Sequence, residues 1–547
     1  MLLHLLVLAP FVAAILMVMT SKEDSKSSSR LAILMGIGFM AMATALVYGG
    51  DMSTEAIEWF HIPGIKGPVY YYLYSHALAS WMVFLSCGLS LVALISARSI
   101  TCRSYRNFAI GIFTLMGAMN GTFLAADAVL FFFFFEAMVI PAAVLIAGYG
   151  GKDRMKAAMT FAIYTLVGSA PMMVALWYLL TIADNSMLIS LAVAVQSLPE
   201  GTQSVLLVSF LLAFLVKTPI FPFHGWQAIS YAEAPAPLSA ILTGAMSKAG
   251  VFGFITWVLP IFPLSMSAVS CMMWLGLVTA VYGALMALRA TDGKKLLAFS
   301  SMGHLGLAVA GVFSLSEAMF PAVLVLLVAH GISAGAQFFL MGIAERMTGT
   351  RELDKLGGLS SKNPVFSTLF GFAGVMALAV PGTAGFVGEF TVLLALWDMG
   401  PLPALVAGFT LILSAAYMLR FIQKVIFGKQ AREYEEGTRT TLLEGVSVAI
   451  MLALLLVFGF HPAFITDSLA RAEATDDAVA AQVLNDAALN QGNVPMTAEE
   501  IHQLDSTLAA AGFKDDERAS IIAQMKGDTE AAATNSANTV KEASDAE

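Results

Sequence analysis

Four ionisable side chains lie inside long apolar stretches of this 547-residue sequence: Glu136, Lys217, Lys248 and Glu389. A lysine near the middle of a membrane costs about 2.5–3.5 kcal/mol to insert, so such residues usually face the protein interior, pair with another group and serve function. Two acids and two bases permit pairing, and in a buried pair the position of one charge controls how tightly the other group holds its proton. The pattern therefore predicts a proton relay. The alternative is a set of static ion pairs that lock helices together.

The sequence around Lys217 combines a buried charge with a predicted helix break. Lys217 lies in the stretch LLAFLVKTPIFPFHGW, and Pro219 and Pro222 follow it within five residues. Proline removes a backbone N–H and clashes with the carbonyl four residues before it, which breaks or kinks a helix. Broken backbone at membrane depth is tolerated only where protein or water satisfies the freed groups. A charge beside a break indicates an ion or proton site, whereas the alternative is a kinked packing helix whose lysine extends to one membrane interface. His224 lies just past this break, and its position alone indicates no role.

Two histidines and a second break extend the pattern towards Glu389. Pro381, in the sequence VPGTAGF just before Glu389, predicts another interrupted helix. His304 and His330 lie in the middle of apolar stretches beside small residues. Each alone is more often a hydrogen-bonded packing residue, but between Lys248 and Glu389 in sequence they are candidates for intermediate proton carriers.

The composition indicates a multi-pass helical membrane protein. Hydrophobic residues make up 58% of the chain and charged residues 12%, and apolar runs near 20 residues long recur from end to end. Cys87, Cys102 and Cys271 lie far apart and form no CxxC or His/Cys cluster, so the sequence indicates no disulfide framework and no metal or iron–sulfur site. It contains no P-loop and no GxGxxG motif that opens a βαβ unit. We therefore expect no nucleotide cofactor in this chain and no nucleic-acid partner.

The apolar runs predict fourteen membrane spans and a definite orientation. The spans lie near residues 2–20, 30–49, 76–97, 105–124, 127–149, 155–183, 204–223, 237–260, 268–288, 295–314, 318–344, 364–397, 401–426 and 440–462. The connections 1–2, 3–4, 5–6, 9–10, 11–12 and 13–14 with their helix ends hold 21 Lys and Arg residues, whereas the even connections hold only Lys66. The positive-inside rule then places the basic connections in the cytoplasm. Both termini are expected on the periplasmic side of a bacterial inner membrane.

The positions of the breaks predict two related halves. Spans 7 and 12 are both interrupted beside a buried charge, which is typical of inverted-repeat transporters built from two five-helix units, here spans 4–8 and 9–13. The predicted regions are residues 1–104 (spans 1–3), 105–260 (first repeat), 261–430 (second repeat), 431–464 (span 14) and 465–547 (an acidic tail). The tail holds 16 acidic and 5 basic residues, so it carries the acidity behind the net charge of −9. Its composition favours a solvated, partly disordered appendage over a functional domain.

Several motifs resemble a known family. The segments KTPIFPFHGW, EAPAPLSAILTGAMSKAG, RATDGKKLLAFSSMGHLG, VAHGISAG and VPGTAGFVGEF resemble the antiporter-like subunits of respiratory complex I, and the resemblance covers about residues 100–430. L-type, N-type and cation/proton antiporter subunits typically carry a lysine in span 12. Here Glu389 follows Pro381, which is similar to the M-type (chain 4) subunit of NADH:quinone oxidoreductase.

The resemblance implies a role for each buried group. The implied relay consists of a coupled acid and base, a connecting base, two central histidines and a terminal acid: Glu136 with Lys217, Lys248, His304 with His330, and Glu389. Asp127 matches a family acid near the start of span 5. Two departures are the sequence YSHALASW, where the family often has an Asp-Gly pair, and a tail longer than the family's.

The resemblance also implies a function. The chain would be a proton-translocating subunit of the enzyme NADH:quinone oxidoreductase with no redox centre of its own. NADH, FMN, iron–sulfur clusters and quinone are then expected in other subunits, and L-type and N-type subunits and lipid are the expected neighbours. The alternatives are a subunit of a cation/proton antiporter or a membrane-bound hydrogenase, and a non-conducting scaffold of the membrane arm. Glu389 argues against the antiporter, and the cost of keeping four buried charges argues against the scaffold.

Overall fold

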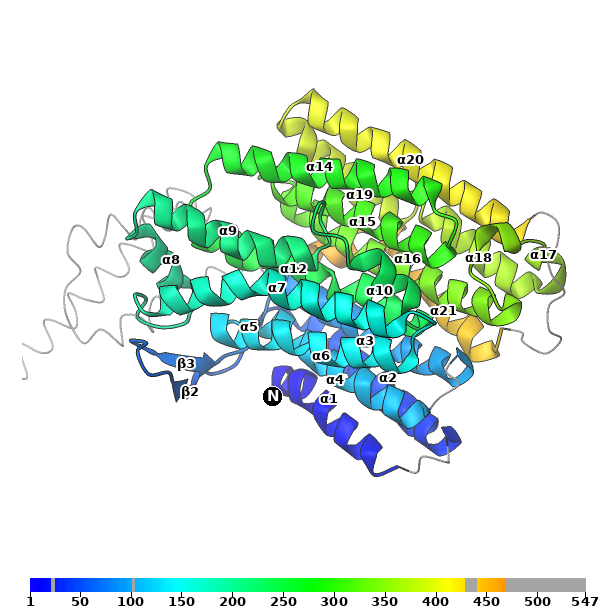
Figure 1. The fold of residues 1–547 in the computed structure, drawn as a ribbon, viewed down its shortest axis with the longest axis horizontal. Coiled ribbons are helices and arrows are strands. Elements are labelled where there is room, and N and C mark those ends of the chain that lie inside the picture. The colour runs from blue at the N-terminus through cyan, green and yellow to red at the C-terminus, as the bar shows by residue number, and fades with distance from the viewer. Residues whose placement is uncertain (21–24, 101–103, 428–439, 469–547) are drawn as a thin grey trace, which may run out of the picture. The chain divides into compact units, whose positions relative to one another are not determined.

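The computed structural model describes residues 1–20, 25–100, 104–427 and 440–468 (Figure 1). All of these residues belong to one unit, Met1–Leu469. The predicted acidic tail, residues 465–547, lies almost wholly outside the described residues.

The described residues are almost entirely helical, as the composition predicts. The first helices are α1 (Leu2–Val18), α2 (Ser25–Gly49), α3 (Ala77–Ile100), α4 (Tyr105–Leu124), α5 (Ala128–Ala137), α6 (Val139–Tyr149), α7 (Arg154–Leu180), α8 (Leu188–Gln196) and α9 (Glu200–Lys217). The middle of the chain forms α10 (Gln227–Glu233), α11 (Ala236–Ile241), η1 (Leu242–Met246), α12 (Lys248–Gly253), η2 (Phe254–Val258) and α13 (Leu259–Ile261). The remaining elements are α14 (Met266–Arg289), α15 (Gly293–Val312), α16 (Met319–Thr348), η3 (Leu353–Lys355), α17 (Leu359–Lys362), α18 (Pro364–Met376), α19 (Ala384–Asp398), α20 (Pro401–Ile426) and α21 (Leu442–Phe460).

The connection between α2 and α3 holds two small antiparallel sheets that the sequence did not indicate. Its strands are β1 (Met52–Ser53), β2 (Ile57–His61), β3 (Pro68–Tyr71) and β4 (Tyr74–Ser75). β1 pairs with β4, with Met52 opposite Ser75, and β2 pairs with β3, with Ile57 opposite Tyr71.

Twelve helices of the described residues are long and apolar enough to cross a membrane. All twelve coincide with predicted spans, so the multi-pass helical architecture is confirmed. The other two predicted spans, 2–20 and 364–397, correspond to the 17-residue helix α1 and to the pair α18 and α19. The count of fourteen and the relation between two five-helix repeats stay predictions.

Four spans depart from continuous α-helix. Proline explains three of the breaks, and the fourth span, α11–α13, contains the π-helical stretches η1 and η2. α9 ends at Lys217, and the irregular residues 218–226 contain Pro219 and Pro222. Residues 377–383, with Pro381, separate α18 from α19. The predicted span 127–149 is divided into α5 and α6 at Met138, because the ring of Pro141 would collide with the carbonyl of Ala137 in a continuous helix.

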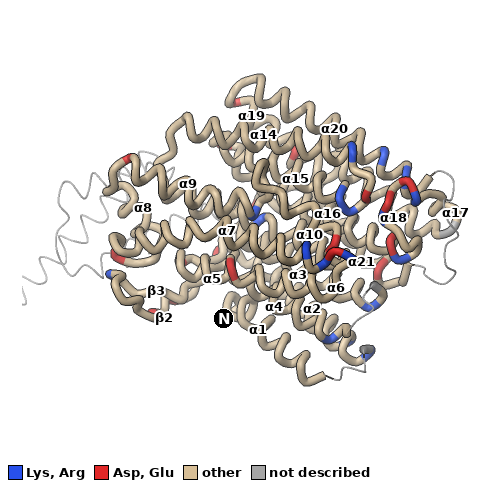
Figure 2. Tube along the Cα trace, viewed as in Figure 1, with Lys and Arg blue, Asp and Glu red and all other residues tan. Residues whose placement is uncertain are grey.

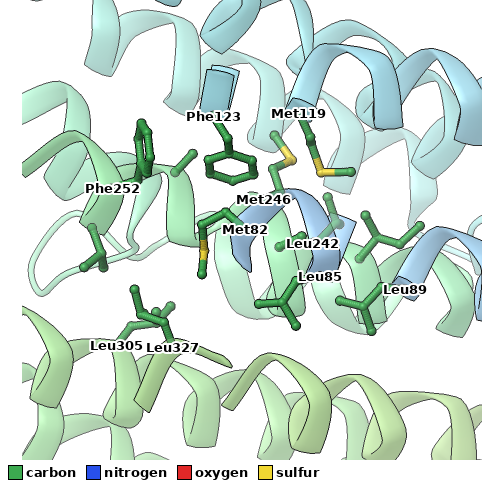
Figure 3. Packing of buried hydrophobic residues seen from close by; sticks show 14 of the residues in the cluster. Met82, Leu85, Leu89, Met119, Phe123, Leu242, Met246, Phe252, Leu305 and Leu327 are labelled. Carbon is green, nitrogen blue, oxygen red and sulfur yellow. The ribbon is translucent and has the colours of Figure 1, made fainter. Parts of the chain in front are cut away.

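The centre of the helix assembly is formed by the α11–α13 span and by α16. In the most apolar 18-residue stretch of the α11–α13 span, 100% of the residues are buried by other parts of the chain. In the corresponding stretch of α16, 94% are buried. Figure 3 shows Leu242 and Met246 of η1 among side chains of α3 and α4, with Leu305 and Leu327 of α15 and α16 beneath them. Lys248 and His330, which lie on these two spans, are therefore enclosed by protein rather than lipid.

The charged residues gather towards one end of the helices. Figure 2 shows most of the blue and red segments near α6, α10, α17 and α18, at the right of the view. This end carries the connections with Lys and Arg clusters that the sequence places in the cytoplasm.

Candidate functional site

His304 and Glu389 form the tightest contact among the predicted site residues. His304 lies on α15 and Glu389 on α19, and Nε2 of the histidine is 3.0 Å from Oε1 of the glutamate. The other ring nitrogen, Nδ1, is 2.8 Å from the carbonyl oxygen of Ser300. Because a carbonyl oxygen only accepts, Nδ1 carries a hydrogen, and the bond to Glu389 then requires one more proton on either the imidazole or the carboxyl. The two side chains therefore share a single proton.

The imidazole of His330 continues this contact towards the centre of the protein. The rings of His304 and His330 are stacked, with centroids 5.1 Å apart and an angle of 20° between their planes. Nδ1 of His330 lies 3.3 Å from Nζ of Lys248. Nε2 of His330 is buried and has no hydrogen-bond partner among the described residues.

Lys248 is fully buried between two stretches of π-helix. η1 ends at Met246 and η2 begins at Phe254, so α12 is a short α-helical stretch between wider turns. Nζ donates to the carbonyl oxygen of Thr243 at 3.2 Å as well as facing His330. Wide turns of this kind are rare and are often found at functional sites. Lys248 therefore occupies the centre of the most buried span, with a backbone oxygen and an imidazole as its polar neighbours.

The predicted pair of Glu136 and Lys217 lies close together without a direct ion pair. Lys217, only 2% exposed, donates from Nζ to the carbonyl oxygen of Phe135 at 3.1 Å, and Nζ lies 4.4 Å from the centroid of that residue's ring. Both carboxylate oxygens of Glu136 are buried without a hydrogen-bond partner among the described residues. Lys217 thus contacts the residue next to the acid rather than the carboxylate itself.

The end of α9, which carries Lys217, packs closely against α12, which begins at Lys248. A Cβ added at Gly250 of α12 would lie 2.0 Å from Oγ1 of Thr218, so the end of α9 lies directly against α12. Oγ1 of Thr218 and both amide atoms of Gln227 are buried with no partner among the described residues. Buried polar groups of native proteins are almost always satisfied, and ordered water is the usual partner where no side chain serves. The structure thus brings the two lysines onto neighbouring helices without direct contact.

A small cavity adjoins the other end of the array. Its volume is about 20 Å³, enough for a single water molecule, and its walls include His304, His330, Glu389 and Gln337. The cavity therefore touches the proton-sharing contact and the stacked ring beside it.

Two predicted accessory residues lie away from this array. Asp127 caps α5: Oδ1 accepts from the backbone N–H groups of Val129 and Leu130 at 2.8 and 3.0 Å, and Oδ2 accepts from Ser186 and from the N–H of Tyr70. The cap accounts for its position.

His224 packs beside the break after α9, apart from the other histidines. Its Nε2 lies 3.2 Å from the hydroxyl oxygen of Tyr282, and its ring stacks on Phe221. Burial lowers the pKa of the His224 imidazole. Pro222 is next to this aromatic group, and Pro219 and Pro381 lie in the two interruptions that their sequence positions predicted.

An ion-pair cluster centred on Arg351 was not predicted from the sequence. The guanidinium pairs with Glu233, at the end of α10, and with Oδ2 of Asp292 at 2.6 Å, and it also donates to the carbonyl oxygen of Ala232. Glu233 in turn accepts from the backbone N–H of Asp153 at 2.9 Å. The sequence showed Arg351 only as one basic residue of a basic connection, and nothing in the letters around Glu233 indicated its partner. The cluster joins the helix that follows the Lys217 break to the start of the helix that carries His304.

Comparison with known proteins places this chain in a family. Residues 125–414 match the family described as NADH:quinone oxidoreductase/Mrp antiporter, TM. The chain belongs to this family. It is 30% identical over 483 residues to NADH-quinone oxidoreductase subunit M of Rhodobacter capsulatus. This match covers 85% of this chain and 94% of that protein. It is also 30% identical over 488 residues to the subunit M of Escherichia coli (strain K12). This match covers 86% of this chain and 96% of that protein.

Solved structures of the NADH:quinone oxidoreductase/Mrp antiporter family agree with this membership. A chain of respiratory complex I from Thermus thermophilus is 29% identical, covers 87% of this chain and 98% of its own length, and has a TM-score of 0.77. A chain of the Mrp complex from Dietzia sp. DQ12-45-1b has a TM-score of 0.75 at 18% identity, which shows the same fold alone. The resemblance to M-type subunits of complex I is thereby confirmed.

Proposed function

We propose that this chain translocates protons as the M-type membrane subunit of an NADH:quinone oxidoreductase. The observation that carries the proposal is the proton-sharing contact of His304 with Glu389, extended through His330 to Lys248 in the two most buried spans. Ionisable residues enclosed in this way at membrane depth are typical of proton pathways. Relatives about 30% identical over nearly their whole length bear the name of this subunit, whereas the Mrp chain is 18% identical, so no observation favours the antiporter.

A proton would move along the array in steps between neighbouring groups. Lys248 gives a proton to Nδ1 of His330 across 3.3 Å, and Nε2 of His304 exchanges a proton with Glu389 across 3.0 Å. The stacked rings of His330 and His304 do not bond to each other face to face. The step between them therefore requires rotation of one ring or a water in the adjoining cavity of about 20 Å³.

The energy for pumping would enter at Glu136 and Lys217. At 100 mV, one charge moved across the membrane requires about 2.3 kcal/mol, which corresponds to a change in proton affinity of about 1.7 pKa units. Lys217 now contacts the carbonyl of Phe135, and a small movement would bring its ammonium to the Glu136 carboxylate. Such a movement changes the field on Lys248, the next charge on the neighbouring helix. Quinone reduction in other subunits would supply the movement.

The same proposal extends to location and partners. The basic connections face the cytoplasm and both termini face the periplasm of a bacterial inner membrane, according to the positive-inside rule. L-type and N-type subunits are the proposed neighbours in the membrane arm. NADH, FMN, the iron–sulfur clusters and quinone would be bound by other subunits, while the residues described above carry only protons.

The test is to measure proton pumping and NADH:quinone activity in membranes that carry Lys217→Ala or Glu389→Gln, with assembly of the complex measured alongside. Loss of pumping in a fully assembled complex is the expected result for both variants. The exposed residue Glu200, at the start of α9, provides a matched control as Glu200→Gln. Normal pumping by both relay variants would leave only the scaffold reading, and a wild-type chain that never co-purifies with an NADH-oxidising partner would overturn the assignment to complex I.

A further inference from the structure

A groove runs along the outer side of α4 and α6, away from the relay. Its volume is about 530 Å³, and the two helices are in contact along its floor. α4 contributes one stripe of side chains that includes Asn107 and Thr114, and α6 contributes another that includes Ile140 and Val144. Ile140 is 68% exposed and Val144 63% exposed, so the groove opens outwards at membrane depth. Figure 1 shows α4 and α6 in blue and cyan beside α1.

The groove is long enough for an extended hydrocarbon chain to lie along it. The stripe from Ser104 to Thr114 spans about 15 Å at 1.5 Å per residue.

One end of the groove is polar and adjoins basic residues. The hydroxyl of Tyr149 donates to the carbonyl oxygen of Ser104 at 2.8 Å, and both residues line the groove. Nε of Arg106 lies 3.4 Å from Oδ1 of Asn107, another lining residue. The connection that follows α6 reads KDRMK, with three bases and one acid. Basic residues at the end of an apolar groove between membrane helices are typical of sites for anionic lipid headgroups.

We propose that this groove binds the acyl chain of a phospholipid whose anionic headgroup is held at Arg106 and the basic connection after α6. The acyl chain covers Ile140 and Val144, and the phosphate lies level with Asn107, beside the guanidinium of Arg106, whose Nη1 also donates to the carbonyl oxygens of Val18 and Thr20. The site does not depend on the proton path, because none of its residues belongs to the relay. A bound lipid at this place would fill a groove between two helices of the described residues.

The test is photo-crosslinking from inside the groove in the assembled complex. Val144 is replaced by benzoylphenylalanine, the complex is reconstituted in vesicles of one part phosphatidylglycerol to nine parts phosphatidylcholine by moles, and the adducts are identified by mass spectrometry. Val167 of α7, 65% exposed against 63% for Val144, receives the same probe as a control at a similarly exposed position outside this groove.

The expected result is a phosphatidylglycerol share of the lipid adducts about fivefold higher at position 144 than at position 167, the preference that one basic residue near the membrane surface provides. Arg106→Gln lowers this enrichment while the lipid adducts remain. Equal lipid composition at the two positions overturns the proposal, and so does an adduct of position 144 with another polypeptide, which would make the groove a subunit interface. The comparison of positions 144 and 167 decides the matter even if Arg106→Gln fails to assemble.

Discussion

The ammonium of Lys217 lies beside Glu136 yet bonds to the backbone of Phe135, so the acid and the base are neighbours that do not neutralise each other through a direct contact. A charged group held by a carbonyl oxygen keeps a nearby carboxylate available as an alternative partner. We propose that the pair has a second arrangement, in which Lys217 leaves the carbonyl and bonds to the carboxylate. A device with two arrangements is what coupling to a distant reaction requires.

Glu136→Gln should remove the carboxylate as an alternative partner of Lys217, and it preserves the shape of the side chain. Proton pumping is expected to fall about tenfold or more, because a loss of 1.36 kcal/mol of coupling already changes proton occupancy tenfold. Pumping per NADH oxidised, measured in vesicles with normal amounts of assembled complex, checks the prediction. A Glu136→Gln complex that pumps at the wild-type ratio would contradict it.

His304 and Glu389 should behave as one unit in a double-mutant cycle. Either His304→Gln or Glu389→Gln removes the shared proton, so the second substitution has nothing further to remove. We expect each single variant and the double variant to lose similar amounts of pumping, since residues that act together show non-additive effects. Losses that multiply in the double variant would mean that the two side chains act independently.

Gly388→Ala should separate this pair without touching either side chain. A Cβ at Gly388 would lie 2.6 Å from Cα and 2.7 Å from the backbone nitrogen of Leu326, so α19 would have to move away from α16. Backbone atoms cannot rotate aside, and overpacking of this kind typically costs about 1–3 kcal/mol. Pumping should fall in the assembled complex, whereas Gly408→Ala, whose Cβ would lie 3.5 Å from Leu393, should be tolerated.

Arg351→Gln should loosen the connection between α10 and the start of α15. The substitution leaves Glu233, which is 6% exposed, without its ion-pair partner, and the cost of breaking a largely buried pair is about 3–5 kcal/mol, less here because Arg351 is partly exposed. Hydrogen exchange of residues 150–153 and 232–234 should become faster. Lys355→Gln is the control, because its pair with Glu352 is about half exposed on both sides, and it should leave exchange unchanged.

The same cluster should show a pH dependence with a definite sign. Burial alone would raise the pKa of the Glu233 carboxyl, but the hydrogen bonds and charge of Arg351 and the N–H of Asp153 hold it below its ordinary value of 4.5. A lowered pKa stabilises the fold above the ordinary value, and that stability is lost as the pH falls through the lower, folded value. Protection of residues 150–153, corrected for intrinsic exchange rates, should be constant from pH 8 to pH 5 and should fall below about pH 4.5. Glu233→Gln should remove this acid transition.

The spans and the relay residues could be predicted because membrane burial makes charges costly and therefore rare. Lys248, His304, His330 and Glu389 stand out among apolar letters, and the structure brings them into one array. The prolines likewise predicted where α9 ends and where α18 and α19 separate. Each of these signals depends on a single residue whose chemistry differs from its surroundings.

Contacts between distant segments could not be predicted in the same way. Lys217 bonds to a carbonyl oxygen, and every residue carries one, so no letter marks Phe135 as its partner. The other carboxylate oxygen of Asp127, Oδ2, likewise accepts from Ser186 and from the N–H of Tyr70, both more than 50 residues away. The π-helical turns around Lys248 have no sequence signature of their own, because they arise from the packing of the whole span.

Lys248, between its two π-helical turns, is held at the centre of the protein by dipoles alone. Its neighbours are the carbonyl oxygen of Thr243 and an imidazole, and among the described residues no carboxylate lies within ion-pair distance of it. No counter-ion among the described residues therefore neutralises the charge of Lys248 in this span. The net charge of the span depends on whether the amine of Lys248 holds its proton. Each proton that binds to or leaves this amine therefore changes the net charge of the span by one unit.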